Sequence, residues 1–120
     1  LDLSENFLYY LPSDFLKFNL NIKQLELSNN FLINFSEKIL KKAFSFKILD
    51  LSSNNLSHYE IITTRYSDHT HLNLRNNTLD YFNFKLIHTF TQLNYLDLNQ
   101  NRLSYLEIDS KVYSNKILYL

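Results

Sequence analysis

Histidine and aspartate gather in one short stretch of the sequence, and both are common metal ligands. Asp68, His69 and His71 lie close together, with His58 further upstream. In an extended segment successive side chains point to opposite faces, so His69 should face the core and His71 the solvent. Zinc needs at least three converging protein ligands. Because the two rings should diverge, we predict no metal site and no cofactor.

Carboxylates are the second group that could do chemistry, because they recur at one position along the chain. General acid–base catalysis needs carboxyl groups that converge on a pocket, whereas evenly spaced ones would form a row. The chain has no glycine for a phosphate-binding loop and no cysteine for nucleophilic catalysis or thiolate ligation of a metal. The sequence therefore predicts that this segment is not an enzyme.

Each of these carboxylates belongs to a repeated frame, Leu-x-Leu-x-x-Asn-x-Leu. The frame occupies residues 1–8, 25–32, 49–56, 72–79 and 96–103, and a sixth copy begins at residues 118–120. The first leucines of successive frames are 24, 24, 23, 24 and 22 residues apart. Near-constant spacing of this kind indicates a stack of similar structural units rather than a leucine-rich composition.

The chemistry of the frame predicts a strand followed by a turn. Leucines two residues apart lie on one face of a strand, so Leu49 and Leu51 should point inward while Asp50 points outward. The turn that follows leaves backbone groups unpaired, and a buried asparagine can both donate to them and accept from them. We therefore predict a structural asparagine ladder made of Asn6, Asn30, Asn54, Asn77 and Asn101.

The outward side chains of these strands should form a binding face. One column reads Asp2, Glu26, Asp50, Asn73, Asp97 and Tyr119, and His71 and Tyr95 belong to the column before it. Stacked carboxylates repel one another, which would favour a basic partner, yet Asp is also an ordinary filling of this frame. Arg75 lies one column over and could pair with Asp50 or Asp97. Both interpretations of the column stay open.

Between the frames, the chain must return to the next strand through apolar supports. In the second return these are Leu32, Phe35, Leu40, Ala43 and Phe46, and in the fourth they are Leu79, Phe82, Ile87, Phe90 and Leu93. Residues 84–90 are expected to form a short helix or 3₁₀ turn. His69 takes a position where other returns carry an apolar residue.

Length and charge limit the remaining possibilities. A chain of 120 residues is expected to form one domain. Twelve basic and twelve acidic residues cancel, so there is no basic surface for nucleic acid. No apolar run reaches the roughly 18 residues that a membrane-spanning helix requires, so we expect no direct membrane insertion by this segment.

With these residues in view, the chain resembles the 24-residue typical class of leucine-rich repeats over essentially its whole length. Leu11-Pro12 matches the continuation of that frame, and Phe46 and Phe90 fall at its later apolar positions. Plant-type repeats carry a glycine, which is absent here. The resemblance implies an α/β solenoid, a right-handed arc with a parallel concave sheet and a mostly irregular or 3₁₀ convex side. Residues 1–120 would hold about five repeats plus a terminal strand, as an interior fragment of a longer protein.

The typical class occurs mainly in extracellular arrays of Toll-like receptors and chaoptin-like adhesion proteins. The resemblance implies non-catalytic recognition of a protein or other macromolecule on the concave face or rim, with flanking repeats of the same chain as neighbours. It implies an extracellular or cell-surface glycoprotein, and sequons stand at Asn34, Asn55 and Asn76, about as many as chance gives in this composition. The alternatives are a cytoplasmic scaffold and a structural spacer without a ligand.

Overall fold

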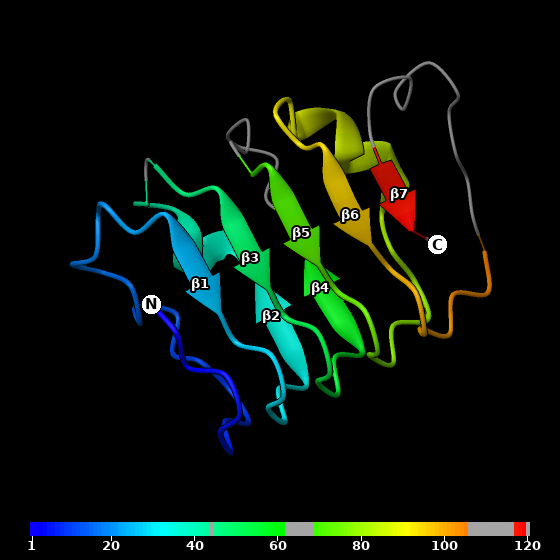
Figure 1. The fold of residues 1–120 in the computed structure, drawn as a ribbon, viewed down its shortest axis with the longest axis horizontal. Helices are drawn as coiled ribbons and strands as arrows, with labels where there is room; N and C mark the ends of the chain where they lie inside the picture. Colours follow the sequence, from blue (N-terminus) through cyan, green and yellow to red (C-terminus); the bar gives the residue numbers. More distant parts are fainter. Residues whose placement is uncertain (44, 62–68, 106–116, 120) are drawn as a thin grey trace.

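Five short strands lie side by side in one parallel sheet (Figure 1). The computed structural model describes residues 1–43, 45–61, 69–105 and 117–119. The strands, in their order across the sheet, are β1 (Gln24–Glu26), β3 (Ile48–Asp50), β5 (His71–Asn73), β6 (Tyr95–Asp97) and β7 (Ile117–Tyr119). Asp2 extends the sheet beyond β1 through an isolated parallel bridge to Glu26. The predicted parallel sheet is confirmed.

The strands are in register at the leucine that lies in the middle of each. Leu25 pairs with Leu49, Leu49 with Leu72, and Leu72 with Leu96. These four side chains are completely buried, because alternate residues of a strand point to opposite faces. The flanking residues of the strands are more exposed and make up what we call the outward face.

A second, two-stranded parallel sheet follows the turns. It pairs β2 (Asn34–Ser36) with β4 (His58–Glu60), and the rings of Phe35 and Tyr59 stack across it at 5.9 Å. The sequence predicted a mostly irregular or 3₁₀ backbone here, so that expectation was wrong for this part. The aromatic residues favour strands because they pack well on a pleated surface.

Two 3₁₀ helices complete the return segments, η1 (Glu37–Leu40) and η2 (Phe84–Thr89). The predicted short helix over residues 84–90 is confirmed. The apolar supports predicted for the second and fourth returns are all buried, so the core lies between the leucines of the large sheet and the aromatic residues of the returns. No helix within the described ranges is long and apolar enough to cross a membrane.

His69 lies in this core, as its position in the sequence predicted. It is only 4% exposed and sits between Phe46 and Phe90, with ring centroids 5.1 and 5.5 Å away. Its Nε2 is 3.7 Å from Oε1 of Glu37, which also accepts a 2.7 Å hydrogen bond from the Tyr59 hydroxyl. Burial lowers the pKa of His69 to about 4, so the ring is neutral at physiological pH.

The frame asparagines connect successive turns through their side-chain amides. Asn54 Nδ2 donates to the carbonyls of Leu51 in its own turn and Leu27 in the preceding one, at 3.1 and 2.9 Å. Its Oδ1 accepts the backbone N–H of Leu32 at 3.0 Å. Equivalent bonds to both turns are made by Asn30, Asn77 and Asn101. Asn6 donates only to its own turn, at Leu3 and Ser4.

The residue before each frame asparagine adopts a left-handed backbone conformation. These residues are Glu5, Asn29, Ser53, Asn76 and Gln100, with φ between 54° and 59°. Such a conformation ordinarily favours glycine, which the chain lacks. The turn is maintained nonetheless because its N–H groups pair with the next turn, as when Ser53 donates to the carbonyl of Arg75 at 2.9 Å.

Candidate interaction surface

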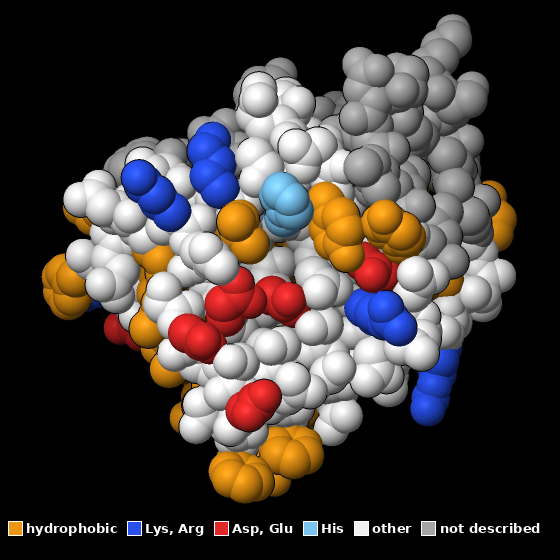
Figure 2. Space-filling model, in the orientation of Figure 1, with side chains coloured by type: hydrophobic (Ala, Val, Ile, Leu, Met, Phe, Trp, Pro, Cys, Tyr) orange, Lys and Arg blue, Asp and Glu red, His pale blue; other side chains and the backbone are white. Residues whose placement is uncertain are grey.

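The outward face begins with a row of carboxylates, which we call the acidic row: Asp2, Glu26 and Asp50. Glu26 is paired in register with Asp50 and bridged to Asp2, so these side chains stand on adjacent parallel strands about 4.8 Å apart. Figure 2 shows acidic side chains gathered together on this face. The structure therefore brings together three of the four acidic residues that the sequence singled out.

Two members of the acidic row also have a local structural role. Asp50 Oδ1 accepts from the backbone N–H of Ser52 at 2.8 Å and from its hydroxyl at 2.6 Å. Asp2 makes the same pair of bonds to Ser4, and these bonds lower the pKa of the Asp2 carboxyl. This is the turn that Asp and Asn form with the N–H two residues later. The Asp-Leu-Ser spacing could have indicated it.

Aromatic rings occupy the other half of the outward face, in what we call the aromatic row: His71, Tyr95 and Tyr119. His71 stacks on Tyr95 with centroids 5.5 Å apart, and Tyr95 lies 5.5 Å from Tyr119 at a tilt of 50°. His71 and Tyr119 are exposed, and Tyr95 is half-buried. The three rings come from β5, β6 and β7. His71 and Tyr95 are in register, whereas Tyr119 is in register with Asp97 and reaches Tyr95 diagonally, so the rings form a continuous strip.

Asp97 does not join the acidic row, which corrects the expectation that it would be exposed. It is only 4% exposed. The hydroxyl of Tyr95 donates to its Oδ2 at 3.3 Å, and the N–H of Asn99 donates to its Oδ1 at 2.8 Å. Burial, and then the charge of Asp97, raises the pKa of Tyr95. Bulky neighbours on the outward face thus cover a carboxylate that alternation alone would expose.

Arg75 forms no ion pair with a carboxylate among the described residues. Its Nε donates to Oε1 of Gln100 at 3.2 Å. The ion pairs found among the described residues involve other groups. The contact that Asp50 makes to β5 is a hydrogen bond from Asn73 Nδ2 at 3.0 Å. The expected pairing of Arg75 with Asp50 or Asp97 is therefore wrong.

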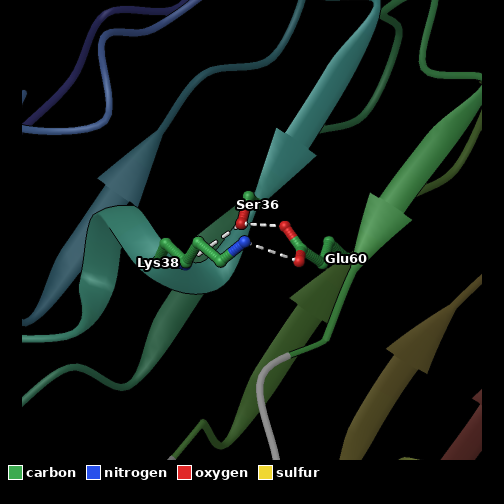
Figure 3. Close-up of polar contacts among 3 residues, drawn as sticks. All are labelled: Ser36, Lys38 and Glu60. Carbon is green, nitrogen blue, oxygen red and sulfur yellow. Dashed lines mark hydrogen bonds and ion pairs between the residues drawn. The ribbon is translucent and has the colours of Figure 1, made fainter.

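A second polar cluster links β2 to β4 on a different part of the molecule (Figure 3). Ser36 donates through its hydroxyl to Oε2 of Glu60, and Lys38 Nζ is 2.9 Å from Oε1 of the same carboxylate. Ser36 also accepts from the N–H of Lys38 and so caps η1. These bonds lower the pKa of Glu60, with Ser36 the largest cause. The cluster links one turn to the next through hydrogen bonds. Its ion pair is exposed and therefore contributes little to the free energy of unfolding.

The remaining predicted positions lie apart from the outward rows. His58 is exposed on β4, His69 is buried, and Asp68 lies outside the described residues. No group of three or more metal-binding side chains occurs within the described ranges. The three sequon asparagines, Asn34, Asn55 and Asn76, are all exposed.

A third exposed group was not predicted from the sequence. We call it the rim cluster, and it consists of Phe7, Tyr9, Phe31 and Ile33. Phe31 stacks against both Phe7 and Tyr9, with centroids 5.9 and 5.5 Å apart. All four side chains are exposed. They follow the frame asparagines of the first two turns, and their apolar character at solvent positions was the signal available in the sequence.

Comparison with models of known protein families finds no match for this chain, and comparison with curated proteins finds none either.

Proposed function

We propose that this chain is a segment of a leucine-rich repeat solenoid whose concave, outward face recognises a protein partner, within a larger extracellular receptor or adhesion protein. The repeated frame, the parallel sheet in leucine register and the asparagine bonds between turns support the repeat assignment. Each is what a stack of similar units requires, because every unit contacts only its neighbours.

The observation that carries the binding role is the aromatic row on the outward face. His71, Tyr95 and Tyr119 form a continuous strip at the surface. Aromatic side chains dominate the energetics of protein interfaces because they bury a large area at low entropic cost. The carboxylates beside the strip are arranged in a row and would act on the orientation and rate of association.

Recognition fits the face better than catalysis does. Asp2 and Asp50 use carboxylate oxygens to hold their own turns, and the buried Asp97 accepts from the hydroxyl of Tyr95. An array of evenly spaced side chains suits contact with another macromolecule.

The test compares two tyrosine variants for binding. The folded chain is screened against a displayed library of extracellular protein domains, and the hits are measured again with Tyr95→Ala and with Tyr81→Ala. Tyr81 is 54% exposed but lies outside the outward face, so it controls for loss of an exposed ring. Binding that weakens about tenfold or more in Tyr95→Ala alone supports the proposal. A chain that captures nothing acts as a spacer, and binding that is unchanged in Tyr95→Ala would rule out the aromatic row as the binding site.

The cellular location needs a separate test, because a cytoplasmic scaffold of the same architecture is the main alternative. The chain is expressed with a secretion signal, and its mass is compared before and after glycosidase treatment. We expect glycans at Asn34, Asn55 or Asn76, which are all exposed. A secreted, folded chain with none of these sites modified would favour the cytoplasmic scaffold.

A further inference from the structure

We infer that the rim cluster and the carboxylates beside it form a docking site for a protein segment in which an apolar or aromatic side chain is flanked by lysine or arginine. The inference rests on the proposed function, which it extends by naming a second surface and the chemistry of the partner. Its site is distinct from the aromatic row.

The apolar character of the rim is not required by the fold. Position by position, the residue after the frame asparagine is Phe7, Phe31, Asn55, Thr78 and then Arg102. The last four donate their backbone N–H to the preceding turn in the same way, at 2.9, 3.0, 3.0 and 2.8 Å. Since polar residues occupy this backbone position three times, the two phenylalanines are not there to maintain the turn.

The position two residues further on repeats this contrast. Tyr9 and Ile33 occupy it in the first two turns, and Ser57, Asp80 and Ser104 in the next three. The change from apolar to polar therefore falls at the same point in both columns. It concentrates four apolar side chains at one end of the rim.

These side chains are costly to expose. Phe7 is 79% exposed, Tyr9 61% and Ile33 53%. Phe31 is held between Phe7 and Tyr9 in near-parallel stacking, with interplanar angles of 13° and 22°. A group of neighbouring exposed aromatics marks an interaction site more often than scattered single ones do. The stacking fixes the rings beforehand, which lowers the entropy lost on binding.

The carboxylates beside the rim cluster indicate the chemistry of the partner. Glu5 immediately precedes Asn6 and Phe7, and the acidic row continues from Asp2 through Glu26. Figure 2 shows hydrophobic side chains at the lower edge of this face, below the acidic ones. Neither Glu5 nor Glu26 forms an ion pair with a lysine or arginine among the described residues. A partner that places an apolar side chain on the rim would bring its neighbouring residues against these carboxylates, so basic residues fit there.

The experiment selects ligands without assuming a sequence. A phage-displayed library of random linear peptides is panned on the chain, with counter-selection on Phe7→Asn/Phe31→Asn. That variant installs the residue that the chain itself uses at Asn55, so the turn should be retained, and its thermal unfolding is compared with that of the wild type. We expect enriched peptides with a lysine or arginine next to an aromatic residue or leucine. Their affinity should fall about tenfold or more in the double variant.

Two further variants keep the test decisive if the double variant unfolds. Glu5→Gln/Glu26→Gln should slow peptide association, most clearly at low ionic strength, while Phe18→Ser should not weaken binding, although Phe18 is 84% exposed. Enriched peptides without basic residues, or binding unaffected by the rim and carboxylate variants, would overturn the inference. So would rim-dependent binding to vesicles of neutral phospholipid.

The outcome is separable from that of the proposed function. Binding that depends on Tyr95 and not on Phe7 or Phe31 leaves the proposed recognition role intact and removes the rim site. Failure of both sets of variants to alter binding removes both proposals.

Discussion

The hydroxyl of Tyr95 donates a hydrogen bond to Oδ2 of Asp97 at 3.3 Å, and Asp97 is only 4% exposed. Two residues that share one strand and point to the same side of the sheet thus have opposite roles. Tyr95 is partly exposed to solvent, whereas Asp97 is buried and accepts its hydrogen bond. Any electrostatic attraction of a partner must come from the other carboxylates of the face.

This relationship predicts which acidic residues act on association. With a peptide selected for binding, Glu26→Gln/Asp50→Asn should reduce the association rate and its dependence on salt, because steering by exposed charge acts mainly on the on-rate. Asp97→Asn should leave both unchanged. Stopped-flow measurements at two ionic strengths compare the variants. A slower rate in Asp97→Asn alone would mean that its charge reaches the partner through Tyr95.

Asn54 and Asn55 are adjacent, but their substitution should differ greatly in effect. Asn54→Ala removes a side chain that donates to Leu27 and Leu51 and accepts from Leu32. Because those backbone groups are buried, we expect a loss of about 1–3 kcal/mol in the free energy of unfolding. Asn55 is exposed, so Asn55→Ala should cost little. Urea denaturation of the two variants provides the comparison, and equal midpoints would contradict the role of Asn54.

His69 should make stability depend on pH. Its pKa falls from an ordinary 6.5 to about 4 in the folded chain, so the unfolded state binds the proton first as the pH decreases. The contribution is complete above the unfolded pKa and is lost between 6.5 and 4. The free energy of unfolding should decrease by about 2 kcal/mol between about pH 7.5 and about pH 5.

The control for this pH effect is His69→Phe. Phe46 and Phe90 lie on either side of the ring, so phenylalanine belongs to the same column of the core. The variant should lose most of the pH dependence in that interval, and an unchanged slope would place the titrating group elsewhere.

The left-handed turns predict a gain of stability from glycine. Ser53 has φ of 54°, a conformation that costs a residue with a side chain about 1–2 kcal/mol. Ser53→Gly should relieve this strain. Once the added conformational entropy of the unfolded chain is subtracted, the free energy of unfolding should rise by about 0.5–1 kcal/mol. Ser53→Val should be destabilising because β-branching is unfavourable there. Asn29→Gly serves as the matched control and should have little effect, since asparagine tolerates this conformation. Thermal unfolding in parallel would test the order.

The sequence predicted the parts of the structure that depend on spacing. Leu25, Leu49 and Leu72 pair in register as their spacing required, because the period of two in a strand decides which side chains can be buried. The buried His69 and the 3₁₀ helix at Phe84–Thr89 follow from the same frame.

Other features depend on contacts between neighbouring turns, and spacing carries no information about them. The pairing of β2 with β4 arises where Phe35 stacks on Tyr59. Asp97 is buried and accepts from the hydroxyl of Tyr95 on its own strand, and Arg75 reaches Gln100 instead of a carboxylate. Each outcome depends on side-chain size and rotamer rather than on position in the frame.

The leucine register has a consequence for how this molecule can be altered. The interval from Leu25 to Leu49 is 24 residues and that from Leu49 to Leu72 is 23, yet both pairs align directly across the sheet. The difference of one residue therefore leaves the leucine register unchanged. Insertions placed between β4 and β5 should leave the outward face undisturbed, whereas one added residue between Leu49 and Leu51 would turn the strand over. Loops, tags or reporter groups are accordingly best grafted at exposed positions of the return segments, away from their buried apolar supports.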